Sequence, residues 1–157
     1  CGRIVQARRM DGGEWERTGH KFKSWSLPGS CAAVPLGLPT LADGVPFVGI
    51  ASGGPDTLAL LACVIAEGRE ADCATLGILG ESVKLAAPVV KQCSGRRVRL
   101  FAHNDEAGRR CAATWAEQLS EAGATVDAFD FSAFGCKDLN DFVKLKPEAR
   151  DCEVMPR

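Results

Sequence analysis

From Pro46 onward, apolar runs typical of strands alternate with segments of helical periodicity. The apolar runs lack the polar alternation of half-exposed strands, which indicates burial on both faces; they cover residues 47–51, 73–79, 98–102 and 126–131. Helices are predicted between and after them, over residues 55–67, 83–90, 106–121 and 138–146. Strands joined by crossover helices predict a parallel sheet with helices on both faces.

The predicted helix over residues 55–67 has Pro55 in its first turn, where the missing N–H group of proline is tolerated. Its apolar face is formed by Leu58, Leu61, Ala62 and Ile65.

The first 45 residues follow a different pattern. Residues 3–9 and 21–26 alternate between apolar and polar side chains, and a turn signal lies at Asp11-Gly12-Gly13, so we expect an antiparallel pair. Residues 27–46 are rich in Pro and Gly and are predicted to be mostly loop. We therefore expect a β-rich extension and connector over residues 1–45 and an α/β domain over residues 46–157.

The bulk composition narrows the function classes. The 157 residues carry a formal net charge of −1, which argues against a protein that binds nucleic acid by a global basic field but leaves a local groove open. No apolar stretch approaches the roughly 20 residues of a membrane span, and no signal peptide is evident. Because the first residue is Cys1 rather than Met, we expect a piece of a longer polypeptide.

The cysteines are scattered without a CxxC pair or a zinc-ribbon spacing. We expect free thiols in a reducing cytoplasm, where disulfides are rare. The eight are Cys1, Cys31, Cys63, Cys73, Cys93, Cys111, Cys136 and Cys152.

Polar clusters follow two of the predicted strands. Ser52-Gly53-Gly54-Pro55-Asp56 comes after the first strand of the α/β part, and His103-Asn104-Asp105-Glu106-Ala107-Gly108 after the third. Open α/β sheets bind ligands at the carboxyl ends of their strands. We expect the side chains of Ser52, Asp56, His103, Asp105 and Asp138 to converge at one edge of the sheet.

The order of these elements, completed by Lys137-Asp138-Leu139-Asn140-Asp141, resembles a TOPRIM domain. This is the metal-binding module of bacterial-type primases, type IA and II topoisomerases and related nucleases. The likeness is closest to bacterial, phage and plasmid primases, whose β-rich segment before TOPRIM is similar to Val5-Gln6-Ala7-Arg8-Arg9 and the residues that follow. The resemblance implies a Rossmann-like TOPRIM fold of about four parallel strands flanked by helices, with an N-terminal β-rich extension.

Two positions depart from the family pattern. Ser52 stands where the family has Glu, and His103 replaces the first Asp of an Asp-x-Asp motif. The resemblance implies catalytic positions at Ser52, His103 and Asp105, metal ligands at Asp105, Asp138 and Asp141, and a weakly bound Mg²⁺ or Mn²⁺. Mg²⁺ prefers oxygen ligands, and two-metal phosphoryl transfer needs clustered carboxylates, so we expect the ordinary magnesium mechanism to be impaired. An imidazole suits zinc, manganese or nickel better.

Each site residue also has a structural interpretation. Asp105 is either a metal ligand or the N-cap of the next helix. His103 is a substitute ligand, a proton donor or a filler of the vacated position, and Ser52 binds a phosphate at a helix N-terminus or fills a tight turn. Asp56 suits the first turn of a helix whatever the function.

Basic residues form two groups that could contact nucleic acid. In the extension, basic residues interleave with aromatic ones, as in proteins that bind single strands, although a solvated antiparallel pair has the same pattern; these residues are Arg8, Arg9, Lys21, Lys23 and Trp25. The second group is either a basic rim of the site or a solvated face: Arg96, Arg97, Arg99, Arg109, Arg110 and Lys137.

The function implied by the resemblance is that of a primase-type TOPRIM segment in DNA replication or mobile-element maintenance, located in the cytoplasm. We expect a degenerate domain that binds single-stranded DNA, a nucleotide or a replication partner such as a helicase, with weak or absent nucleotidyl transfer and no membrane contact. One alternative is an active metal-dependent primase with a rebuilt metal site. Another is a structural module that positions a helicase or nuclease domain.

Overall fold

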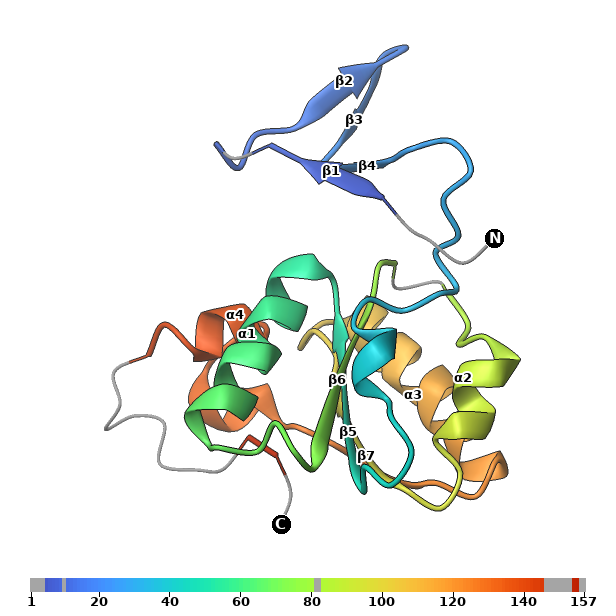
Figure 1. Cartoon of the computed structure of the whole chain (residues 1–157). Coiled ribbons are helices and arrows are strands. Elements are labelled where there is room, and N and C mark those ends of the chain that lie inside the picture. The colour runs from blue at the N-terminus through green and yellow to red at the C-terminus, as the bar shows by residue number, and fades with distance from the viewer. Residues whose placement is uncertain (1–4, 10, 81–82, 146–153, 156–157) are drawn as a thin grey trace.

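The computed structural model describes residues 5–9, 11–80, 83–145 and 154–155. Figure 1 shows two parts, a small N-terminal β extension and an α/β unit, with the extension lying beyond one end of the parallel strands. The start of the strand predicted over residues 3–9 (residues 3–4) and the end of the helix predicted over residues 138–146 (residue 146) lie outside the described residues.

One parallel sheet organises the α/β unit. Its four strands have the order β6-β5-β7-β8, with all neighbours parallel. The strands are β5 (Phe47–Ser52), β6 (Cys73–Ile78), β7 (Arg97–Phe101) and β8 (Thr125–Ala128). Because β5 and β6 are almost wholly buried, they contain none of the polar alternation of a half-exposed strand.

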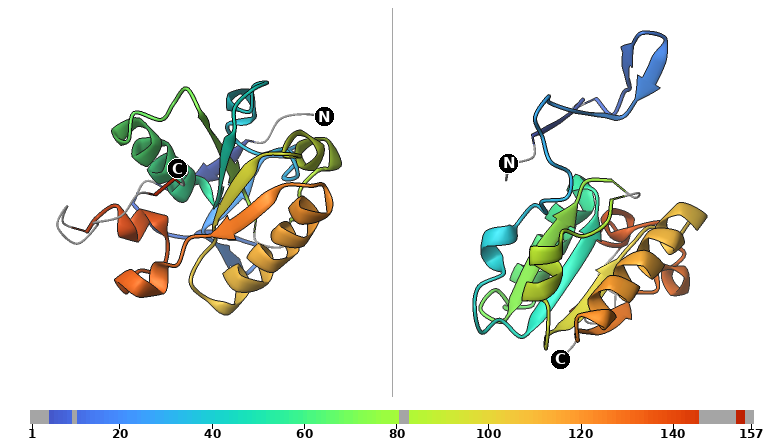
Figure 2. Two further views of the ribbon diagram at one scale, coloured as in Figure 1. Left: turned by 90° about the horizontal axis from the view of Figure 1, so that it is seen from below. Right: turned by 90° about the vertical axis from the view of Figure 1, so that its right-hand side faces the viewer.

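Helices cover both faces of this sheet, as the two views of Figure 2 show. They are α1 (Gly54–Ala66), α2 (Ala87–Gln92), α3 (Glu106–Glu121) and α4 (Leu139–Phe142). On the face of α2 and α3, Trp115 is fully buried and its indole N–H donates to the Val83 carbonyl at 2.8 Å. On the other face, α1 and α4 pack with a cluster of phenylalanines around Phe129. The expected α/β architecture with a four-stranded parallel sheet is confirmed.

Val154 and Met155, near the carboxyl end of the chain, are part of the core beneath α1. The carboxylate of Glu67 accepts hydrogen bonds from the backbone N–H of Val154 at 2.7 Å and of Met155 at 3.4 Å. These contacts fix the return of the chain to the end of α1.

The extension contains two antiparallel ribbons. β1 (Gln6–Arg8) pairs with β4 (Ser24–Ser26), and β2 (Trp15–Arg17) pairs with β3 (His20–Phe22). The single strand expected over residues 21–26 was therefore wrong, because the chain breaks it at Lys23. Thr18 and Gly19 both have positive φ, which is typical of the two-residue turns that join hairpins, and this turn pairs β3 with β2.

Three predicted bounds need correction. α2 begins at Ala87 rather than at residue 83, because Pro88 is tolerated only in the first turn of a helix. The last strand ends at Ala128, and Phe131–Phe134 forms a 3₁₀ helix that Asp130 caps. α4 is a single turn that ends at Phe142.

The apolar face predicted for α1 lies toward solvent. Leu58 is 70% exposed and Ile65 54% exposed, while Leu60 and Val64 are buried against the sheet. α1 is apolar on nearly all sides, so its periodicity does not identify the face that packs.

No disulfide joins the cysteines that the structure describes, namely Cys31, Cys63, Cys73, Cys93, Cys111 and Cys136. Within the described ranges, no helix has the length and apolar character needed to cross a membrane.

Candidate functional site

The turn between β5 and α1 places Asp56 at the edge of the sheet. Gly53 has a φ of 95°, a conformation that favours glycine, and turns the chain into the helix. The helix then lies very close to β6, since a Cβ atom on Gly77 would lie 1.9 Å from Oγ1 of Thr57. This close approach fixes the first turn of α1, and Asp56 is 4% exposed there.

The turn between β7 and α3 positions His103 in a similar way. A Cβ atom on Gly108 would lie 2.1 Å from the His103 carbonyl oxygen, so a glycine lets the helix contact this turn. Asp105 caps α3, because its Oδ1 accepts a hydrogen bond from the Gly108 N–H at 2.8 Å.

The segment before α4 completes the edge. The Asn104 N–H donates to the Lys137 carbonyl at 2.7 Å, which ties this segment to the turn after β7. Asp138 caps α4 by accepting from the Asp141 N–H at 2.8 Å. The Asn140 N–H donates to Oδ1 of Asp56 at 2.9 Å, which joins α4 to α1.

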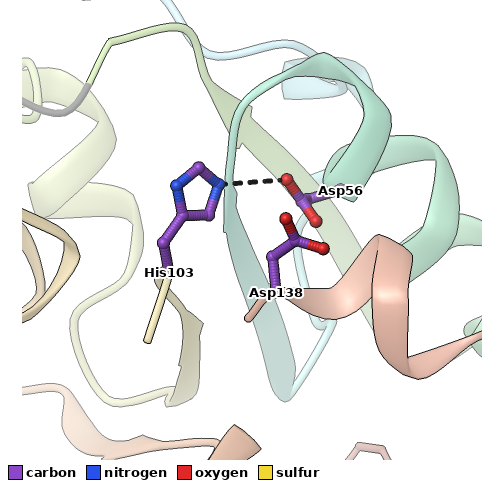
Figure 3. A group of neighbouring side chains, drawn as sticks. All are labelled: Asp56, His103 and Asp138. Carbon is purple, nitrogen blue, oxygen red and sulfur yellow. Dashed lines mark hydrogen bonds and ion pairs between the residues drawn. The ribbon is translucent and has the colours of Figure 1, made fainter. Parts of the chain in front are cut away.

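Asp56, His103 and Asp138 point toward one another from these three segments, as Figure 3 shows. One potential ligand atom from each lies within 4.8 Å of the others, and no other such group occurs among the residues that the structure describes. Nε2 of His103 lies 3.3 Å from Oδ2 of Asp56. We call these three residues the Asp-His-Asp group.

The donor set of this group fits a divalent cation. Two carboxylates and one imidazole supply the oxygen and nitrogen ligands that Mn²⁺ and Zn²⁺ accept, whereas Mg²⁺ prefers oxygen alone. Ligand atoms at roughly 2.0–2.2 Å from a cation lie up to about 4 Å apart, so small side-chain movements bring the three atoms into range.

A sequence model of the family described as Toprim-like matches residues 53–143. The chain belongs to the Toprim-like family. No match was found among curated proteins or among solved structures. The matched residues contain the whole Asp-His-Asp group and begin directly after Ser52.

In this Toprim-like chain, two of the residues predicted as metal ligands lie outside the Asp-His-Asp group. The Asp105 side chain caps α3, and the pKa of its carboxyl lies below the usual value, first because of the Gly108 N–H and further because basic side chains lie nearby (His103, Lys137 and Arg109). Asp141 pairs with Lys144 at 3.3 Å. Their predicted role as ligands stays a prediction.

Ser52, at the carboxyl end of β5, is 2% exposed. Together with His103 it lines a pocket of about 300 Å³, whose other wall is formed by Gln6, Arg8 and Ser24 of the extension. The extension of this Toprim-like chain thus lies directly against the candidate site.

The basic residues predicted to contact nucleic acid are dispersed. Arg8 lines the pocket, whereas Arg9 pairs with Asp11. Trp25 is 37% exposed and lies 5.7 Å from the Arg17 guanidinium, in cation–π geometry. Lys21 and Lys23 are exposed.

The basic rim considered for the site is not one surface. Arg97 begins β7, at the opposite end of the strand from His103, and Arg99 pairs with Asp127. Arg110 pairs with Glu106 on α3. Lys137 and Arg109 both lie near Asp105, so these two members of the set have a clear place near the site.

The sequence indicated Asp56 and Asp138 but did not indicate that the Asn140 N–H binds Asp56. That contact spans 84 positions and comes from the backbone of α4, so the side-chain pattern contains no signal for it. The Gly-x-x-Asp spacing was the signal that could have placed Asp56 among the metal ligands rather than outside them.

Proposed function

We propose that this chain is a Toprim-like domain that binds a divalent cation at the Asp-His-Asp group, with Mn²⁺ preferred over Mg²⁺, and thereby binds phosphates of a nucleotide or of single-stranded DNA. The observation that carries the proposal is the convergence of two carboxylates and an imidazole within 4.8 Å, at the edge where open α/β sheets bind ligands. A cation held there would offset the negative charge of a phosphate.

The proposal includes weak or absent nucleotidyl transfer. Ser52 has no carboxylate to accept a proton or to add negative charge, and Asp105 is already engaged as a helix cap. The remaining carboxylates therefore suit binding better than the clustered charge that phosphoryl transfer requires. We also propose that the domain belongs to a primase-type protein of DNA replication or mobile-element maintenance, on the strength of its two turns and the Lys137–Asp141 element.

A second candidate is a structural module without a cation. It is favoured by the contacts of Asp56, whose two oxygens bind the Asn140 N–H at 2.9 Å and His103 at 3.3 Å and so join α1, α4 and the turn after β7. A buried carboxylate with both oxygens engaged can serve as a clamp on the fold.

Metal titration separates the two candidates. Binding of Mn²⁺, followed by the loss of its free electron paramagnetic resonance signal, should be saturable and should weaken about tenfold or more in Asp56→Asn and in Asp138→Asn. Asn at position 138 still caps α4, so the helix is retained. Asp43→Asn is the matched control, because Asp43 is exposed in a turn. Absence of saturable binding in the native chain would favour the structural module.

A further inference from the structure

The pocket between the extension and the sheet contains groups that suit an anion. It measures about 300 Å³, at the lower end of the volumes of small-ligand sites. Arg8 of β1 lines one side, and Ser52, Gly53 and Gly54 line the other. His103, a member of the Asp-His-Asp group, also lines the pocket. Within the described residues Arg8 forms no ion pair, so its positive charge is available to a ligand.

The N-terminus of α1 opens onto the same pocket without a side-chain cap. Its N-cap is Gly53, which has no side chain, and Pro55 has no N–H group. α3 and α4 differ, because Asp105 and Asp138 cap them. The Gly53 N–H donates to the Ile78 carbonyl at 2.8 Å, so the N–H groups of Gly54 and Asp56, together with the helix dipole of the 13-residue α1, favour an anion at this end.

Ser52 provides an independent sign of a ligand. Ser52 is only 2% exposed as a residue, yet its hydroxyl makes no hydrogen bond within the part of the chain that the structure describes. Because Ser52 lines the pocket, its hydroxyl is open to a hydrogen bond with a ligand there.

We propose that this pocket is a phosphate-binding subsite in which Arg8, the Ser52 hydroxyl and the first turn of α1 bind a phosphate directly, without a metal ion. The identity of the ligand rests on the proposed function, because the phosphate would belong to the nucleotide or DNA bound beside the Asp-His-Asp group. A glutamate at position 52, as in the family pattern, would place a negative charge in the pocket and repel the phosphate. Serine at this position instead makes the pocket complementary to an anion.

The subsite is tested with the whole chain in EDTA, so that no cation contributes. ATP is added while the backbone N–H signals of Gly53 and Gly54 are followed by NMR. Their signals should shift in a saturable way. Affinity should fall about tenfold in Arg8→Ala and about fivefold in Ser52→Ala, as expected for hydrogen bonds to a charged group. Arg17→Ala removes an equal charge from the same extension and should leave affinity within about twofold, since Arg17 lies over Trp25 rather than in the pocket.

A short thymidine strand without a terminal phosphate identifies the source of the phosphate. If the Gly53 and Gly54 signals shift with ATP but not with the thymidine strand, the phosphate comes from a free nucleotide. If they shift with ATP and with the thymidine strand, a DNA phosphodiester also fits the subsite. Equal ATP affinity in the native chain, Arg8→Ala and Ser52→Ala, or no shift with either probe, would overturn the subsite. If the subsite fails but Mn²⁺ still binds, the proposed function is retained. If ATP binds as expected but Mn²⁺ does not, only the cation site is contradicted.

Discussion

Nε2 of His103 lies 3.3 Å from Oδ2 of Asp56, and this contact joins two turns that are 47 positions apart in the sequence. Each turn follows a central strand of the sheet, and the third member of the group, Asp138, comes from the N-terminus of α4. The group therefore exists only in the folded chain, and residues that hold the turns in place control it as much as the ligands themselves.

Restoring the family's carboxylates should improve magnesium binding. The double replacement Ser52→Glu with His103→Asp adds oxygen ligands in place of a hydroxyl and an imidazole, so Mg²⁺ affinity measured by calorimetry should rise about tenfold or more. Ser120→Glu, on the exposed side of α3, controls for added charge and should have little effect. Unchanged Mg²⁺ affinity in the double variant would mean that positions 52 and 103 do not form a metal site.

Gly108→Ala should destabilise the chain, although an alanine in a helix usually stabilises it. The new Cβ atom would lie 2.1 Å from the His103 carbonyl oxygen, and displacement of this turn should cost about 1–3 kcal/mol of unfolding free energy, measured with urea. Gly54→Ala is the matched control in the first turn of α1, where the nearest atom to a new Cβ is 3.9 Å away. An equal effect of the two replacements would show that Gly108 does not hold the His103 turn.

Two leucines of α1 should differ sharply in their contribution to stability. Leu60→Ala removes a fully buried side chain and should lower the unfolding free energy by about 2–5 kcal/mol. Leu58→Ala removes a side chain that is 70% exposed and should change it by less than about 0.5 kcal/mol. Equal losses in urea denaturation would mean that α1 packs through the other face.

The Cys73 thiol should resist alkylation at pH 9. Burial, followed by a hydrogen bond to Asp72, raises its pKa to about 12, so it stays protonated where an ordinary thiol is largely ionised. Because the pKa is raised in the folded chain, this thiol contributes stability below its unfolded pKa and loses that contribution as the pH rises toward 12. Mass spectrometry of iodoacetamide-treated protein should show labelling of half-buried Cys31 well before Cys73. Simultaneous labelling would contradict the buried position of Cys73.

Much of the sheet could be predicted from the sequence, because buried parallel strands are continuous apolar runs and α3 has a clear cap at Asp105 and stop at Gly123. The packing face of α1 could not. The helix contains Leu58 and Leu61 on one side and Leu60 and Val64 on the other, and the close approach of Thr57 to Gly77 lies on the buried side.

The candidate site was predictable in part, for a similar reason. The two polar turns identified Asp56 and His103, since the ends of parallel strands meet at one edge of a sheet. The sequence left open whether Asp105 would bind a metal or cap its own helix, and it did not indicate that Arg8 of the extension and Ser52 would line one pocket. Both depend on side-chain direction and on contacts between distant segments.

The most direct test of the Asp-His-Asp group is the pulsed electron paramagnetic resonance spectrum of Mn²⁺ bound to the native chain. A directly bound imidazole couples its nitrogen nucleus to the electron spins of Mn²⁺, and His20, the other histidine, lies in β3 of the extension. We predict a nitrogen modulation that disappears in His103→Asp while Mn²⁺ remains bound, and that persists in His20→Asn. Bound Mn²⁺ without nitrogen modulation, or a modulation that survives in His103→Asp, would contradict a cation site built from Asp56, His103 and Asp138.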